Sequence, residues 1–163
     1  MVDNKSSNIT KTKILLVLLI LTLAFIWGHS MVPKTLSADE SGRALKLLYP
    51  LLSLFLDSKD ITNHLVRKMA HFTEYAVLGM ELRPLVGMYR SNGKAALFNK
   101  EMVFIPAVAY AFFTSFIDET IQIFSGRGPQ IADVWLDVFG AFCGAGIISL
   151  IGMRVRKSGI SKS

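Results

Sequence analysis

The sequence predicts an all-α membrane protein: a bundle of four transmembrane helices with a short interfacial or re-entrant segment in the first outer loop. Hydrophobic residues make up 52% of the 163-residue chain and the mean hydropathy is +0.44, which is high for a soluble protein. Apolar runs long enough for a hydrocarbon core, which takes about 20 residues, begin at Ile14, Met102 and Asp133. A fourth begins with VRKMAHFTEYAVLG at residue 66 and stays apolar to Tyr89.

The first apolar run is expected to be an uncleaved signal anchor. Lys5, Lys11 and Lys13 precede it, as in a signal peptide. The following GHSMVPKTLSADE has no clean small-x-small cleavage site, and the run is long for a signal peptide.

The net charge of +6 does not indicate a nucleic-acid partner, because no basic helix or patch with interleaved aromatic residues accompanies it. In a membrane protein, an excess of Lys and Arg usually marks the cytoplasmic side. The single cysteine, Cys143, excludes a disulfide framework within the chain and a cysteine-based metal site. We expect it to be a packing residue.

Three regions rich in Lys and Arg are expected on the cytoplasmic side. They are the N-terminal tail (Lys5, Lys11, Lys13), the middle connection (Arg83, Arg90, Lys94, Lys100) and the C-terminal tail (Arg154, Arg156, Lys157, Lys162). The connection from Pro33 to His64 has balanced charges and is expected outside with the turn SGRGPQ. The prediction is a multi-pass protein of the cell membrane with both termini in the cytoplasm.

The domain prediction is a loose cytoplasmic tail over 1–13, a membrane domain over 14–155 and a second loose cytoplasmic tail over 156–163. Within the first outer connection, RALKLLYPLLSLFL is strongly apolar but short, and Pro50 interrupts it. We interpret it as the interfacial or re-entrant segment, because a fifth crossing would place the two basic tails on opposite sides.

Ionisable residues gather at three helix ends that are expected at the same outer depth. Arg67, His71 and Glu74 have spacings of four and three and so share one helix face. The next predicted helix ends with Asp118, Glu119 and Gln122, the turn adds Arg127, and the last helix begins with Asp133 and Asp137. Such residues are costly in hydrocarbon and normally face a bundle interior, where they pair with one another.

The stretches RKMAHFTEYAVLG and DETIQIFSGRGPQIADVWLDVFGAFCGAG resemble the VanZ-like family of small bacterial membrane proteins. The family motif has Arg-Lys-x-x-His-x-x-Glu-Tyr, then Asp-Glu-x-x-Gln, Gly-Arg, Asp-x-x-x-Asp and a Gly, and it matches residues 66–146. One departure is Asp137-Val138-Phe139-Gly140, where many relatives have Asn before the Gly. The resemblance implies a cell-envelope role and an association with resistance to the glycopeptide teicoplanin, without implying a reaction.

The predicted binding site consists of ten polar residues at the outer face: Arg67, Lys68, His71, Glu74, Asp118, Glu119, Gln122, Arg127, Asp133 and Asp137. Simpler roles compete for some of these residues. Lys68 could extend to lipid phosphates, Asp133 could be a helix N-cap, and the ion pairs could only lock the bundle. Gly140, Gly144 and Gly146 are expected to pack helices closely.

Three classes of function remain. The first is binding of an anionic membrane lipid, a lipid-linked wall precursor or a glycopeptide, with Arg67, Lys68 and Arg127 on the anion. The second is an intramembrane enzyme whose candidate catalytic residues are His71, Glu74, Asp118 and Asp137. The third is a proton-coupled transporter, for which Glu81 would continue the polar path. We expect no cofactor and no metal, because one histidine with carboxylates, the set His71, Glu74 and Asp137, is weak evidence for a metal site.

Overall fold

The computed structural model describes residues 2–89, 104–128 and 130–160. Over this part of the chain it contains five α-helices and no strand, so the prediction of an all-α protein is confirmed. The helices are α1 (Val2–Ser30), α2 (Lys34–Leu52), α3 (Asn63–Tyr89), α4 (Phe104–Phe124) and α5 (Ile131–Ile160). Residues 2–13 and 156–160, predicted as loose tails, are continuous with α1 and α5.

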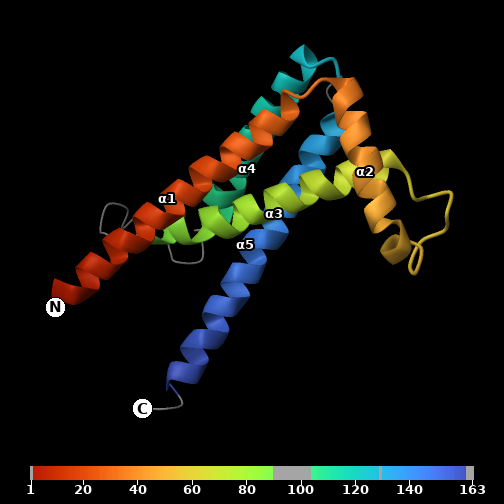
Figure 1. Ribbon diagram of the computed structural model, residues 1–163. Coiled ribbons are helices and arrows are strands. Elements are labelled where there is room, and N and C mark those ends of the chain that lie inside the picture. Colours follow the sequence, from red (N-terminus) through yellow and green to blue (C-terminus); the bar gives the residue numbers. More distant parts are fainter. Residues whose placement is uncertain (1, 90–103, 129, 161–163) are drawn as a thin grey trace.

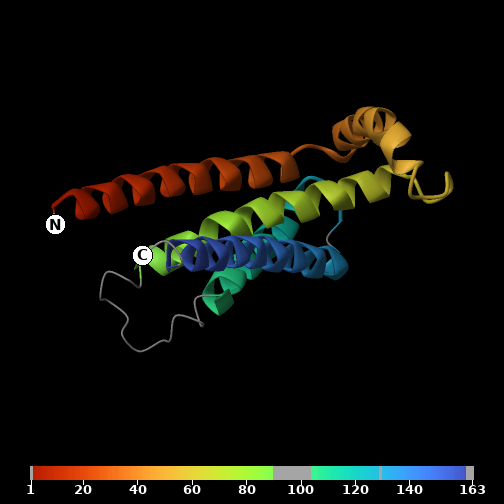
Figure 2. The ribbon, with the colours of Figure 1, turned by 90° about the horizontal axis from the view of Figure 1, so that it is seen from below.

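Four of the helices alternate in direction, and α3 lies at the centre of them. The start of α1 and the end of α5 lie at one end of the molecule, and α2 lies at the other end (Figures 1 and 2). Helix α3 contacts each of the other four helices, and its contact with α5 is the most extensive. This arrangement brings the end of α4 and the starts of α3 and α5 together near the end of α1.

Within the part of the chain that the structure describes, three segments are long and apolar enough to cross a membrane: Ile9–Ser30, Phe104–Phe124 and Ile131–Arg154. The chain therefore has the helices of a membrane protein. Helix α3 has 27 residues, which is long enough to cross a membrane. Its charged residues exclude it from the three apolar segments, so the fourth crossing stays a prediction. The predicted interfacial segment falls in α2 and the turns after it, with Pro50 inside the helix; its place at the membrane surface also stays a prediction.

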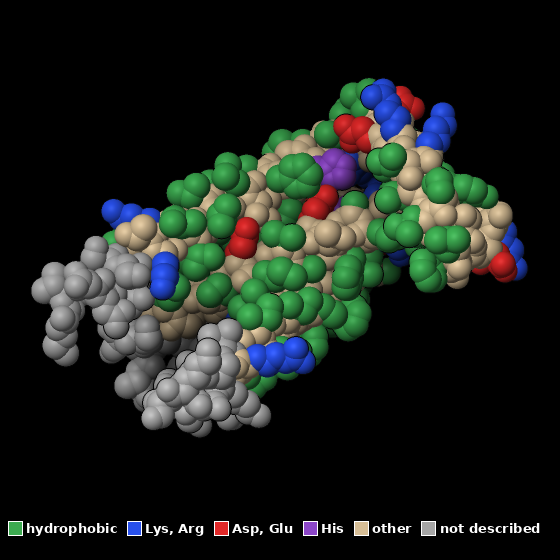
Figure 3. Space-filling model, turned by 60° about the horizontal axis from the view of Figure 1, so that its bottom comes forward, with side chains coloured by type: hydrophobic (Ala, Val, Ile, Leu, Met, Phe, Trp, Pro, Cys, Tyr) green, Lys and Arg blue, Asp and Glu red, His purple; other side chains and the backbone are tan. Residues whose placement is uncertain are grey.

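The distribution of side chains is the reverse of that in a soluble protein. Phe124 is 87% exposed and Trp135 65%, whereas Asp118 and Asp137 are 0% exposed. Figure 3 shows hydrophobic side chains over much of one face, with Lys and Arg toward the ends of the molecule. An apolar exterior of this extent is stable against lipid and would be unstable in water.

The apolar core is small and joins four helices. It consists of Ile26 from α1, Tyr75, Leu78 and Leu82 from α3, Ala107 and Ala111 from α4, and Ala141 from α5. Alanines supply three of the seven positions, so α4 and α5 approach α3 closely. A second cluster of Leu52, Ile61 and Val66 attaches α2 and the loop after it to the start of α3.

Glycines set the spacing between α3 and α5. A Cβ atom on Gly79 would overlap the carbonyl oxygen of Ala141, and one on Gly144 would overlap that of Ala76. A Cβ atom on Gly140 would lie 2.5 Å from the carbonyl oxygen of Phe72. The packing prediction is thus confirmed for Gly140 and Gly144 and is wrong for Gly146, where a Cβ would meet no atom within 4 Å.

Candidate functional site

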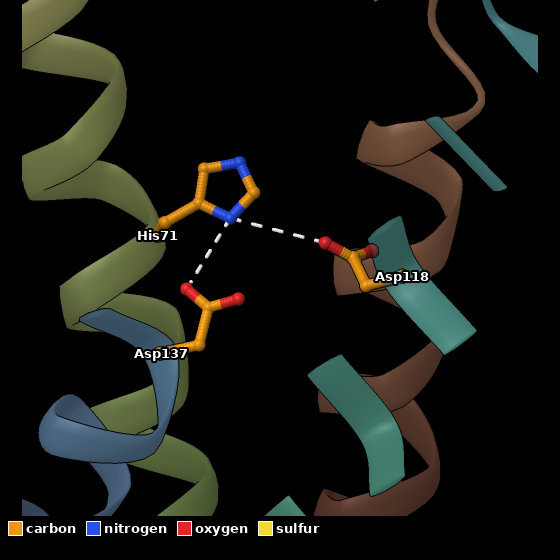
Figure 4. Close-up of side chains that lie close together, drawn as sticks. All are labelled: His71, Asp118 and Asp137. Carbon is orange, nitrogen blue, oxygen red and sulfur yellow. Dashed lines mark ion pairs between the residues drawn. The ribbon is translucent and has the colours of Figure 1, made fainter. Parts of the chain in front are cut away.

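Three buried ionisable side chains from three different helices meet near one end of the bundle (Figure 4). Nδ1 of His71, on α3, lies 3.5 Å from Oδ1 of Asp137, on α5, and 3.8 Å from Oδ2 of Asp118, on α4. His71 is 3% exposed and both carboxylates are 0% exposed. We call these residues the His71–Asp118–Asp137 triad. The predicted meeting of α3, α4 and α5 holds for these three residues.

Neighbouring polar groups hold the two carboxylates in place. The hydroxyl of Ser115 donates to Oδ2 of Asp137 at 2.7 Å. Nε2 of Gln122 lies within hydrogen-bond distance of Oδ2 of Asp118 (3.2 Å) and Oε1 of Glu119 (2.9 Å). Ser115, Asp118, Glu119 and Gln122 are all buried on α4, and their spacings of three, one and three place them on one helix face.

Glu119 connects this polar face to the start of α5. Its Oε2 accepts a hydrogen bond from the backbone N–H of Gln130 at 2.8 Å, just before α5 begins at Ile131. A carboxylate at a helix N-terminus is stabilised by the unpaired N–H groups and by the helix dipole. Glu119 therefore fixes the entry into α5, which is a structural role for this predicted site residue.

Glu74 faces α1 and does not join the triad. Its Oε1 lies 3.3 Å from Nδ1 of His29, near the end of α1. Nε2 of the same histidine lies 3.7 Å from Oε2 of Glu40 on α2. His29 thus bridges α2 and α3. The spacing predicts one helix face for His71 and Glu74, but only His71 meets Asp118 and Asp137, and Glu74 lies on the neighbouring side of α3.

The turn between α4 and α5 places Arg127 in the interior. Gly126 adopts a positive φ of 73°, and the N–H groups of Gly126 and Arg127 donate to the carbonyls of Ile123 and Gln122. This is the Schellman ending of a helix, which requires a residue such as glycine in the left-handed region. Gly128 has a φ of 78°. Two glycines therefore turn the chain so that the arginine between them points inward.

Arg127 is 8% exposed. Among the described residues, its three guanidinium nitrogens have no hydrogen-bond partner. Burial lowers the pKa of Arg127, and the nearby positive charge of Arg67 lowers it further, while the carboxylates of Asp118, Glu40 and Glu74 act in the opposite direction. The partly buried Arg67 is thus close enough to Arg127 to act on its charge.

Lys68 and Asp133 form an ion pair beside this site, with 3.4 Å between Nζ and Oδ1. Asp133 lies in the first turn of α5, which begins at Ile131, so it is inside the helix and is not the N-cap. Lys68 thus has a partner within the protein and keeps 33% of its side chain exposed, so its extension to lipid phosphates stays a prediction. Arg67 is close to His64, with 3.3 Å between its Nη2 and Nδ1.

Sequence reasoning missed four polar residues at the site: His29, Ser30, Tyr75 and Ser115. Ser115 could have been found, because it lies three residues before Asp118 on the same face. His29 and Ser30 end an apolar run at the predicted outer depth, and Ser30, 1% exposed, lies against Asp118. Tyr75 is fully buried and lies one helical turn after His71. Its hydroxyl is near Ser115 and the two aspartates.

The arrangement has two chemical capacities. The inward-pointing Arg127, with Arg67 nearby, suits an anion. The triad suits a cation or a proton, since it combines an imidazole nitrogen with two carboxylates. Glu81 lies farther along α3 and is buried. The hydroxyl of Thr22, on α1, donates to its Oε1 at 3.0 Å. Glu81 is the one residue that the sequence predicted for a deeper polar path.

Comparisons with known proteins place the chain by sequence. The family model described as VanZ/LLP1 matches residues 15–152, a range that includes the triad, both arginines and most of the three candidate spans. Comparison with curated proteins gave no match, and comparison with solved structures gave none.

Proposed function

This chain belongs to the VanZ/LLP1 family, and we propose that it binds the anionic headgroup of a membrane lipid or lipid-linked wall precursor at the outer face of the membrane. Arg127 and Arg67 contact the anion in this proposal. The single observation that carries it is the buried guanidinium of Arg127, which has no hydrogen-bond partner among the described residues.

A buried arginine without partners is energetically unfavourable. Each buried donor that finds no acceptor costs about 1–3 kcal/mol, and more when the group is charged. Guanidinium presents five N–H donors in a planar fork that matches the oxygens of a phosphate or carboxylate. An anion between Arg127 and Arg67 would satisfy these donors and reduce the repulsion between the two positive charges.

An apolar groove near this polar end favours a lipid over a soluble anion. The groove has a volume of about 370 Å³ and runs between α4 and α5, where Phe112, Phe116, Ile123 and Trp135 line it together with Glu119. An acyl chain would fit such a lining, with the polar headgroup toward the turn that carries Arg127.

The proposed orientation places this turn outside the cell and both termini in the cytoplasm. The two ends of the chain that are rich in Lys and Arg support it. We expect a cysteine at Ser58, which is exposed in the α2–α3 loop, to react with an impermeant thiol reagent on intact cells, in a protein with Cys143→Ala. A cysteine at Lys11 should react only after lysis. Labelling of Lys11→Cys on intact cells would overturn the orientation.

The lipid proposal is tested with purified full-length protein in mixed micelles of phosphatidylglycerol and phosphatidylcholine. Native mass spectrometry is expected to show retention of phosphatidylglycerol by wild type. Arg127→Gln should reduce that retention by about tenfold, the effect of losing roughly 1.4 kcal/mol from a charged hydrogen bond. Arg127→Lys should fall between the two, because the ammonium keeps the charge without the planar fork.

Lys59→Gln is the matched control. Lys59 is an exposed cation that lies near Asp57 in the α2–α3 loop, so its loss changes the net charge equally without touching the site. The proposal fails if Arg127→Gln and Lys59→Gln retain phosphatidylglycerol equally. It also fails if wild type retains phosphatidylcholine as well as phosphatidylglycerol.

The second candidate is an enzyme that acts on the headgroup of the bound lipid. The triad favours it, since a histidine beside two carboxylates is the arrangement of a general acid or base. The same spectra test it: wild type would yield a lipid of changed headgroup mass, and His71→Gln would leave the lipid intact.

A further inference from the structure

The geometry points to a divalent cation site formed by Nδ1 of His71 and one carboxylate oxygen each of Asp118 and Asp137, with Zn²⁺ or Mn²⁺ as the ion. We propose this site independently of the anion site at Arg127. It would make the triad a metal centre at the junction of α3, α4 and α5.

The distances within the triad suit metal ligands better than hydrogen-bond partners. The imidazole nitrogen lies 3.5 Å and 3.8 Å from the two carboxylate oxygens, which is beyond the 2.7–3.2 Å range of N–H···O hydrogen bonds. Two ligands bound at about 2.1 Å in a tetrahedral arrangement are about 3.4 Å apart. One ligand atom from each of the three residues lies within 4.8 Å of the other two, so a single ion could reach all three.

The same side chains have unused capacity. Among the described residues, Nδ1 of His71, Oδ1 of Asp118 and Oδ1 of Asp137 are buried without a hydrogen-bond partner. Such groups are rare in native structures and call for an unseen partner. Nδ1 of His71 and Oδ1 of Asp137 face each other, and the Asp118 oxygen toward them is Oδ2 (Figure 4). One ion would satisfy the first two atoms together and take Oδ2 of Asp118 as its third ligand.

Charge balance also favours a divalent ion. Two ionised aspartates with a protonated histidine leave one net negative charge in a site with no exposure, and a neutral histidine leaves two. A divalent cation with neutral His71 brings the triad to zero. Uncompensated charge is unfavourable at this depth, so the ion would stabilise the meeting of the helices and leave Arg127 available to an anion.

The surroundings resemble the second layer of a metal site. Ser115 donates to the far oxygen of Asp137, and Gln122 lies within hydrogen-bond distance of Asp118. Partners of this kind orient carboxylate ligands in metal sites. One nitrogen and two carboxylate oxygens form a mixed set that suits Zn²⁺ or Mn²⁺, whereas Ca²⁺ and Mg²⁺ prefer oxygen ligands throughout.

These ligands differ in one residue from the set of possible ligands in the sequence. The sequence offers His71, Glu74 and Asp137, whereas the structure brings Asp118 to His71 and Asp137 in place of Glu74. Glu74 lies against His29, so it serves as a control acid of similar location on the same helix as His71.

The test uses full-length protein without a histidine tag, stripped with a chelator and dialysed against Zn²⁺, Mn²⁺, Mg²⁺ or Ca²⁺. We expect about one Zn²⁺ or Mn²⁺ per chain by elemental mass spectrometry, as for a single three-residue site. The melting temperature should rise by roughly 5 °C or more when the free ion is at 100 times its Kd. Mg²⁺ and Ca²⁺ should leave both quantities unchanged.

Two variants assign the ion to the triad. Asp137→Asn should lower the bound Zn²⁺ or Mn²⁺ at least tenfold and abolish the melting shift, while Glu74→Gln should keep both. Failure of wild type to bind either ion overturns the proposal, and this result requires no variant to fold. Equal binding by wild type and Asp137→Asn also overturns it, since the ion would then lie elsewhere. Neither result bears on lipid retention by Arg127.

Discussion

Helices α3 and α5 pack against each other in two different ways along their length. Near the start of α5, polar side chains separate them, and Asp137 faces His71 across 3.5 Å. One turn farther, no side chain separates them, because Gly140 and Gly144 lie against the backbone of Phe72 and Ala76. The first region carries the chemistry of the site, and the second region carries the close packing.

The two regions depend on each other. Gly140 follows Asp137 by three residues, and its contact, Phe72, is next to His71. The glycine contact therefore fixes how far apart the helix axes lie at the point where the imidazole and the carboxylate meet. A change at the glycines should disturb fold and site together, while a conservative change in the triad should disturb the site first.

The largest effect is expected from Gly144→Ala. Its Cβ would overlap the carbonyl oxygen of Ala76, which belongs to the backbone and cannot rotate away, so α3 and α5 must separate. Overpacking of this kind costs about 1–3 kcal/mol or more. We expect less folded protein after extraction from membranes and a lower melting temperature, measured by fluorescence size-exclusion chromatography with heating.

Gly146→Ala is the matched control, two residues away on the same helix. A Cβ there meets no atom within 4 Å, and alanine favours a helix interior over glycine by about 1 kcal/mol. Folded yield should equal or exceed that of wild type. Equal losses in the two variants would mean that the α3–α5 contact does not set the stability of the bundle.

The sequence predicted the apolar stretches of α1, α3, α4 and α5 and only part of α2. The segment RALKLLYPLLSLFL was recognised by its hydrophobicity, whereas the helix begins at Lys34. The first half of α2, KTLSADESG, is polar, and hydropathy cannot distinguish a polar helix outside the membrane from a loop. For the same reason the sequence predicts a loose tail over 1–13, where the structure has the polar start of α1.

The sequence predicted which residues make up the candidate site, but it did not predict which neighbouring helix each side chain faces. Spacing placed His71 and Glu74 on one face. Two side chains three positions apart on a helix of 3.6 residues per turn still differ by about 60° in direction. Because α3 has helices on several sides, a difference of this size is enough for the two side chains to contact different helices. His71 meets α4 and α5, while Glu74 meets His29 of α1. The position of α1 beside α3 follows from the packing of the whole bundle and cannot be read from local spacing.

The remaining comparison is among three polar residues of α3, which differ in burial and in partners. His71 meets two fully buried carboxylates, Glu74 meets partly exposed His29, and Lys68 pairs with Asp133 while keeping a third of its own side chain exposed. Replacement of each by Gln keeps a similar size and removes the ionisable group. The effects on function should therefore decrease in the order His71, Glu74, Lys68.

Teicoplanin resistance stays a prediction from the family resemblance, so the experiment first measures whether wild type protects a sensitive host against teicoplanin. Each variant is then compared with wild type, and the amount of protein in the membrane is measured in parallel. His71→Gln is expected to lose the protection, because the amide cannot replace an imidazole between two carboxylates. Glu74→Gln should lose part of it, since the amide can still hydrogen-bond to His29. Lys68→Gln should stay close to wild type, because a partly exposed ion pair contributes only about 0–1 kcal/mol. Wild-type protection by all three variants at wild-type membrane levels would mean that these charges only hold the bundle together and that the site has no part in resistance.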